Sequence, residues 1–330
     1  MANSEQRFTR SIQKAAAANH AAAPPATAGG SVDHATLVPM RRLIVNADDF
    51  GMTSGVNRAI AESHKSGVVT SATIMANEAA VDEAIALASQ NPSLGTGCHV
   101  VLVDGAPVSQ PDSVQSLIGS RNGDLARFRA GIAHLAVAAV SRSVREPEVH
   151  GEASAQIERL QSRGLSLSHV DCHMHSHILP AISRAVLRAA HDHDVRAVRN
   201  PFEPAWSVAA THKSSSLRSW NRSAQVTVLR ALEHQFLSTV KQNGMKTTDG
   251  TIGIAVTGLL DRDLLTRLVN AMPDGTWELV THPGYHDRDL SAAKTELKES
   301  RAVELELLKA SATREMFQNK GIQLISYREL

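Results

Sequence analysis

From residue 41 onward, short apolar runs rich in β-branched residues alternate with longer stretches whose apolar residues recur with a helical period. Such alternation is typical of repeated strand–helix units, whose strands lie parallel in one sheet. Eight runs are suitable strands, and eight strands predict a closed or nearly closed barrel. We expect the strands at residues 43–47, 71–75, 97–102, 167–172, 195–199, 253–256, 277–281 and 323–326.

Helical periods and two long connections complete this pattern. We expect helices at residues 54–66, 181–193, 261–271 and 292–318. Residues 103–150 and 200–250 are too long for a minimal strand–helix connection, so we interpret them as insertions that shape a substrate pocket. The expected fold class is therefore α/β, a distorted (β/α) barrel that is TIM-barrel-like and carries insertions.

Residues 1–38 differ from the rest of the chain, because they are rich in Ala, Pro, Gly and Ser and lack periodic bulky residues. We expect a flexible N-terminal tail, disordered or weakly helical, followed by a single α/β-barrel domain over residues 39–330. The tail has no continuous apolar stretch typical of a secretory signal. The longest apolar run, within residues 131–140, is too short to cross a membrane.

Composition excludes several classes of protein. The 34 basic and 33 acidic side chains nearly cancel, so the net charge indicates no nucleic-acid partner. Two cysteines in 330 residues do not make a disulfide scaffold, and they favour a reducing cytoplasm. Sixteen histidines against two tyrosines and six phenylalanines favour metal or acid–base chemistry, because imidazole serves both.

Reactive side chains stand where predicted strands end. Asp48 and Asp49 directly follow the strand at 43–47, and His99 lies in the third strand. His282 ends the seventh strand within WELVTHPGY, where we interpret it as a proton donor or acceptor rather than only a turn residue. Barrel enzymes keep their reactive groups at these strand ends, so one shared pocket is expected.

The run DCHMHSH adds four ionisable groups to the fourth strand end. Side chains two apart share a face in an extended segment, so all four would point into one pocket. Unpaired buried polar groups are costly, which disfavours a purely structural role for the set. The four residues are Asp171, His173, His175 and His177.

One carboxylate and two imidazoles leave open coordination positions on a divalent ion, as a catalytic metal requires. We therefore predict Asp49, His99 and His173 as metal ligands. Cys98 and Cys172 each precede a predicted ligand by one position, so they should face away and pack as small hydrophobes.

The segments NADDFG, GCHVVL, DCHMHSH and HPGY, in this order, resemble the YdjC-like carbohydrate deacetylases over residues 42–330. The resemblance implies a distorted α/β barrel, a divalent metal held by one Asp and two His, and action on N-acetylated sugars such as chitooligosaccharides. It also implies Asp48 as the catalytic base, His282 as the acid, and Asp49, His99 and His173 as the ligands.

Two stretches look most like the hopanoid-biosynthesis-associated branch of that family: HVVLVDGAPV, which starts at His99, and VRNPFEP at residues 198–204. This likeness implies an N-acetylglucosaminyl hopanoid lipid as substrate, and a cytoplasmic enzyme that works at the inner face of the membrane. The segment 125–140 is the candidate for peripheral lipid contact, although such stretches are more often helices packed on their own core.

Five further side chains at predicted strand ends are expected to orient the reactive groups or to hold sugar hydroxyls, without single roles assigned. They are Asn77, Asp171, His175, His177 and Arg199.

The identity of the metal stays open. Mg and Zn are favoured, while Mn, Co and Ni also suit a site of mixed oxygen and nitrogen ligands. The oligomeric state, including a homo-oligomer, stays open as well.

Two other functions are alternatives. A barrel with Asp and His ligands also suits metal-dependent hydrolysis of another bond, such as a phosphoester, but no Walker-type motif is present. A noncatalytic sugar- or metal-binding protein would not need both Asp48 and His282.

Overall fold

The computed structural model describes residues 40–122, 125–211 and 219–330, with the backbone alone described over 219–230. The tail expected at residues 1–38 lies outside the described residues. Residues 39–330 belong to one compact unit.

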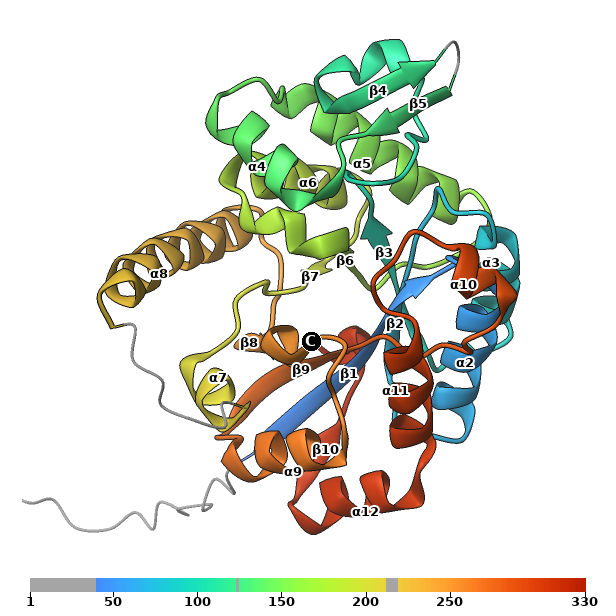
Figure 1. The fold of residues 1–330 in the computed structure, drawn as a ribbon, viewed down its shortest axis with the longest axis vertical. Coiled ribbons are helices and arrows are strands. Elements are labelled where there is room, and N and C mark those ends of the chain that lie inside the picture. Colours follow the sequence, from blue (N-terminus) through green and yellow to red (C-terminus); the bar gives the residue numbers. More distant parts are fainter. Residues whose placement is uncertain (1–39, 123–124, 212–218) are drawn as a thin grey trace, which may run out of the picture. The chain divides into compact units, whose positions relative to one another are not determined.

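Eight parallel strands form one curled sheet at the centre of this unit (Figure 1). Seven of them follow the order β7-β6-β3-β2-β1-β9-β8, and the eighth, β10, pairs with β1. The strands are β1 (Arg41–Phe50), β2 (Ser71–Ile74), β3 (Gly95–Val100), β6 (His169–Cys172), β7 (Ala197–Val198), β8 (Gly250–Ile252), β9 (Gly275–Thr281) and β10 (Ile322–Leu324).

Strand β1 is the centre of the sheet, and its last eight residues are buried. It pairs with β9 along most of its length on one edge. On its other edge β10 pairs with the first residues of β1 and β2 pairs with the last, so two strands share that edge. The register with β2 shifts between Ala47 and Phe50, and this bulge contains Asp48 and Asp49.

The two ends of the sheet approach each other through the segment before β8. Ala197 in β7 forms a parallel bridge with Lys246, and the Val198 amide donates to the Lys246 carbonyl. Further along, the Thr251 amide donates to the Phe202 carbonyl. The sheet is therefore a nearly closed, distorted barrel, and the predicted fold class is confirmed.

Helices lie outside the sheet and in the two insertions (Figure 1). The first insertion holds an antiparallel hairpin, β4 (Ile118–Asn122) and β5 (Leu125–Phe128), and helix α4 (Gly131–Val140). The second holds α7 (Ala205–Thr211) and α8 (Ser219–Gln242). The other helices are α2 (Ser54–Lys65), α3 (Val81–Ser89), α5 (Glu146–Gln161), α6 (Pro180–Asp192), α9 (Arg262–Ala271), α10 (Arg288–Ala292), α11 (Glu299–Lys309) and α12 (Ser311–Asn319).

Two predicted elements are wrong. The strand predicted at 253–256 lies earlier, at β8, because Gly253 adopts a left-handed φ of 93° that turns the chain into a short 3-10 helix. The helix predicted at 292–318 begins only at Glu299, because residues 293–298 form a loop after α10, and it is broken where Ala310 is extended between α11 and α12. Thr313 and Phe317 are the buried residues of α12.

None of the helices in the described ranges is long and apolar enough to cross a membrane.

We predict that Gly97→Ala destabilises the fold by about 1–3 kcal/mol, measured by urea unfolding. A Cβ atom at Gly97 in β3 would lie 2.6–2.8 Å from three ring atoms of His169. That ring cannot withdraw easily, because it stacks on the Tyr327 ring with centroids 3.8 Å apart.

Gly151→Ala is the matched control. Gly151 is an exposed residue of α5. Apart from its chain neighbours and the adjacent backbone of α5, no atom of the described ranges lies within 4 Å of the position that a Cβ atom would take there. This substitution should raise stability by up to about 1 kcal/mol. Equal effects of the two substitutions would contradict the steric explanation.

Candidate active site

The reactive side chains predicted at strand ends surround one cavity of ≈ 780 Å³ at the carboxyl ends of the strands. The cavity is also bordered by the loop between α10 and α11. The predicted site residues that line it are Asp48, Asp49, His99, His173, His175 and His282.

Asp49 occupies an unusual backbone position at the bulge of β1, with φ of 66°. Few non-glycine residues adopt such a φ, and bulges commonly re-aim a side chain next to an active site. One carboxylate oxygen, Oδ2, pairs with Arg301 of α11 at 2.5 Å. The other, Oδ1, is buried and has no hydrogen-bond partner among the described residues.

Two imidazole nitrogens face this unpartnered oxygen. Asp49 Oδ1 lies 3.5 Å from His99 Nε2 and 3.4 Å from His173 Nδ1, and the two nitrogens are 3.2 Å apart. Asp171 Oδ1 lies 2.7 Å from His99 Nδ1, which leaves Nε2 free to offer its lone pair when the ring is neutral. Three electron-pair donors thus converge, and this buried cluster could hold a metal ion.

The charges around His99 also favour a cation at this cluster. Burial alone would lower the pKa of His99, but Asp171, with Asp48 and Asp49, raises it to about 9. Without another cation, a proton on His99 compensates the surrounding carboxylates. A divalent ion held by the cluster would supply that positive charge instead.

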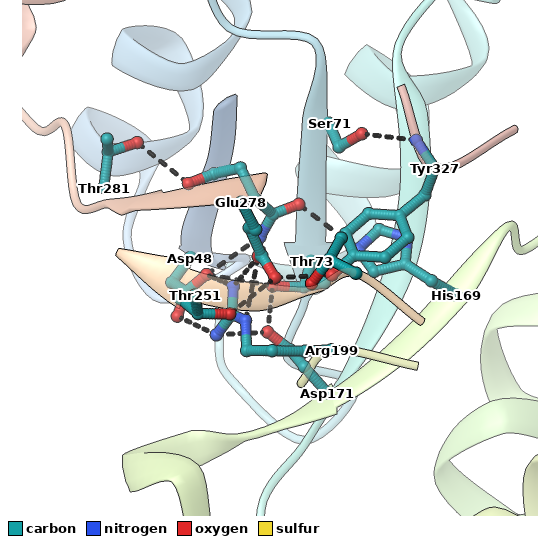
Figure 2. A network of polar contacts seen from close by, with 12 residues as sticks. Asp48, Ser71, Thr73, His169, Asp171, Arg199, Thr251, Glu278, Thr281 and Tyr327 are labelled. Carbon is teal, nitrogen blue, oxygen red and sulfur yellow. Dashed lines mark hydrogen bonds and ion pairs between the residues drawn. The ribbon is translucent and has the colours of Figure 1, made fainter. Parts of the chain in front are cut away.

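Asp48 lies beside the cluster and is held by a dense set of contacts. Arg199 donates to both of its oxygens, at 2.7 and 2.5 Å (Figure 2). Asn46 Nδ2 donates to Oδ1 at 2.9 Å. Burial alone would raise the pKa of Asp48, but the Arg199 guanidinium holds it well below its usual range. Asp48 is therefore ionised and fixed in orientation.

His282 follows β9, and its Nε2 lies 3.9 Å from Asp48 Oδ2. Its backbone amide donates to the Glu304 carboxylate of α11 at 2.6 Å, which fixes the turn after the strand. Burial lowers the pKa of His282 to about 4, although Asp48 and Asp49 oppose this effect. The ring is therefore neutral at neutral pH.

The extended segment predicted from residue 171 to 177 is wrong, because the strand ends at Cys172. Residues His173–Ile178 form a 3-10 segment in which Met174 and His175 have positive φ values of 53° and 51°. His175 lines the cavity, whereas His177 is buried away from it, with Nε2 3.2 Å from the Arg199 carbonyl. The four residues therefore do not share one face.

Asn77 is not among the described residues that line the cavity. Its Nδ2 donates to the Ala106 carbonyl at 2.7 Å, and a Cβ atom at Gly105 would lie 2.8 Å from that nitrogen. Asn77 thus contacts the loop after β3 rather than the cavity itself. Cys98 and Cys172 form no disulfide and are buried in the hydrophobic core, as predicted.

Four side chains of the site were missed by the sequence reasoning. Arg301 and Glu304 are buried residues of α11. The sole sequence signal for them is their spacing of three residues, which puts both side chains on one face of a helix. Glu278 is inside β9, away from the end of the predicted strand. Tyr327 directly follows the strand predicted at 323–326, but it was not among the candidate residues. A charged residue inside an otherwise apolar strand, as in WELV, is the signal that could have found Glu278.

The chain is similar to known proteins over most of its length. The model of a family described as YdjC-like protein matches residues 42–319. A carbohydrate deacetylase of Brevibacillus brevis is 35% identical over 88% of this chain and 99% of its own length. One from Geobacillus stearothermophilus is 31% identical over 88% of this chain and 98% of its own length.

A solved structure shares the fold. The crystal structure of a putative cellobiose-phosphate cleavage protein from Enterococcus faecalis aligns with a TM-score of 0.69 at 23% identity. The alignment covers 88% of this chain and 98% of that one. At this identity the likeness concerns the fold alone.

We predict that Glu304 makes the fold less stable as pH rises. Burial raises the pKa of Glu304 from 4.5 to about 7, so the folded state binds this proton more tightly than the unfolded state does. Its contribution to stability is therefore complete below pH 4.5 and is lost as pH rises through about 7. The loss is on the order of 3 kcal/mol.

Glu304→Gln keeps an oxygen acceptor for the His282 amide but does not titrate. Its free energy of unfolding, measured by urea at a series of pH values from 4.5 to 8, should fall less than that of the wild type. Glu306→Gln, an exposed change on the same helix, should follow the wild type. Parallel curves for the wild type and Glu304→Gln would contradict the assignment.

Proposed function

The chain belongs to the YdjC-like protein family, and on that premise we propose that it hydrolyses the acetamide of an N-acetylated amino sugar with the help of one divalent metal ion. It is a carbohydrate deacetylase, and therefore a hydrolase. The finer assignment rests on the convergence of Asp49 Oδ1, His99 Nε2 and His173 Nδ1 beside the pair Asp48 and His282, all at one cavity.

In this proposal Asp49, His99 and His173 hold the metal. A divalent ion there supplies a Lewis acid, which makes water more acidic and polarises the acetamide carbonyl. Asp171 keeps the His99 ring in the tautomer that metal ligation needs. Arg301 pairs with Oδ2 of Asp49, so that Oδ1 is the oxygen that faces the two imidazoles. Two imidazole nitrogens favour a transition ion such as Zn²⁺ over Mg²⁺.

Asp48 is the proposed base, which accepts a proton from the attacking water. Because His282 is neutral before the reaction, the proton that it gives to the leaving nitrogen has to reach the ring during turnover. The 3.9 Å between Asp48 Oδ2 and His282 Nε2 supports a transfer from Asp48 once substrate is bound. Acetate and a free amino sugar are the products.

For the substrate we propose an N-acetylglucosaminyl lipid of the hopanoid type, met at a membrane surface. A second cavity of ≈ 700 Å³ shares Asp104 and Lys294 with the first and is lined in part by α4. Val137 of α4 lines this second cavity and is 70% exposed. Leu125 of β5 and Val140 of α4 are also largely exposed, at 76% and 82%. Exposed aliphatic groups beside a cavity that continues the reaction site support an apolar aglycone.

We predict metal-dependent release of acetate from N-acetylglucosaminyl lipid, and less from chitobiose. Asp48→Asn should lower kcat by about a hundredfold or more, because an amide cannot accept the proton. Chelation should abolish release, and Zn²⁺ should restore it better than Mg²⁺. Tight metal binding without release from either substrate would favour the phosphoester hydrolase or the noncatalytic binding protein.

We also predict that Val137→Asp and Val140→Asp lower kcat/KM for the lipid by about tenfold while kcat/KM for chitobiose stays within about twofold. A charge on this face opposes contact with an apolar surface. Val303→Asp, an exposed aliphatic position on α11, is the control and should change neither value. Equal losses on both substrates would contradict lipid contact by α4.

A further inference from the structure

Arg199 is fully buried and binds three carboxylates through Nε, Nη1 and Nη2 (Figure 2). Nη1 and Nη2 bind Asp48, Nη1 also lies 2.6 Å from Asp171 Oδ2, and Nε donates to Glu278 Oε1 at 2.8 Å. The guanidinium is planar, so its orientation fixes the positions of the carboxylates that it binds. Whatever orients Arg199 therefore orients Asp48.

Glu278 is the one of these three acids that has no part in the proposed reaction. It is fully buried within β9 and is not among the described residues that line the cavity. Its second oxygen, Oε2, accepts from the Tyr327 hydroxyl at 2.5 Å and lies 3.1 Å from Thr251 Oγ1. The Thr251 hydroxyl has one proton, and its closer acceptor is the Asn200 carbonyl at 2.7 Å. Tyr327 is therefore the main donor to Oε2 of Glu278.

Tyr327 is also connected to Asp48 by a second route. Its ring stacks on His169, with an angle of 10° between the ring planes, and His169 Nε2 lies 3.2 Å from Asn46 Oδ1. The amide nitrogen of Asn46 donates to Asp48, so its oxygen faces His169 and the hydrogen between them belongs to Nε2. Two chains of contacts thus run from Tyr327 to the same carboxylate.

We propose that Tyr327 and Glu278 are positioning residues of the deacetylase, which hold Arg199 so that it presents Asp48 to the reaction cavity. This inference rests on the proposed role of Asp48 as the base. Without the Tyr327 hydroxyl, a buried carboxylate oxygen of Glu278 loses its donor, and a buried group in that state is costly. Glu278 then rotates or binds a proton, and Arg199 follows it.

The ionisation of these groups agrees with this arrangement. Burial raises the pKa of Glu278, while Arg199 and Tyr327 lower it, so the hydroxyl helps to keep the carboxylate ionised. Burial also raises the pKa of Tyr327, which keeps its proton available to donate.

The two tyrosines of the chain provide a matched test. Each donates its hydroxyl to a glutamate: Tyr327 to Glu278 inside the barrel, and Tyr285 to Glu62 at 2.7 Å nearer the surface. Tyr327→Phe keeps the ring that stacks on His169 and should lower kcat by about tenfold with KM within about twofold. Tyr285→Phe removes the same kind of hydrogen bond nearer the surface and should change neither constant.

A double-mutant cycle with Glu278→Gln shows whether Tyr327 acts through Glu278. Effects of residues that act through one another are not additive. Tyr327→Phe should therefore cost less than about twofold in kcat when Glu278→Gln is already present. If Glu278→Gln fails to fold, the comparison of the two tyrosine variants decides alone.

Full kcat in Tyr327→Phe, with the wild type active, would overturn the inference. A parallel change of kcat and KM with a lower Tm would also overturn it, because that pattern indicates a general structural role. If the wild type and Tyr285→Phe both release no acetate from any substrate, the proposed function itself is wrong and the inference falls with it.

Discussion

The site depends on the burial of Arg199 among acidic groups. Moving a guanidinium or a carboxylate out of water costs several kcal/mol, and only close pairing offsets that cost. Arg199 pairs with Asp48, Asp171 and Glu278 together, so one cation stabilises three buried anions. Even so, the anions outnumber the guanidinium groups that pair with them. The raised pKa of His99 and the capacity of the cluster for a cation are two results of this excess of negative charge.

The bulge in β1 brings two adjacent acids to one cavity with different cationic partners. In a regular strand, Asp48 and Asp49 would point to opposite faces. The positive φ of Asp49 lets both carboxylates reach the same cavity, where each is held by a different arginine. Two neighbouring acids would repel each other, and separate cationic partners remove that difficulty.

The barrel could be predicted because the spacing of apolar residues along the chain reflects which segments form buried strands and which form helices. It placed Asp48, Asp49, His99 and His282 at one cavity because parallel strands end on the same side. It failed where backbone geometry departs from regular elements, as after Cys172, where left-handed residues direct His177 away. It also missed Arg301, since nothing local in a helix shows which distant carboxylate will face it.

The pairing of residues far apart in the chain has a consequence for how this site forms. Asp49 and Arg301 are separated by 252 positions, and Asp48 and Arg199 by 151. Contacts of such long range form only after much of the chain has collapsed, which makes folding slow relative to helical proteins. A fragment that contained every proposed metal ligand, but ended before α11, would still lack the cation that holds Asp49. The geometry proposed for a metal ion is thus a property of the completed barrel, and it arises late in folding.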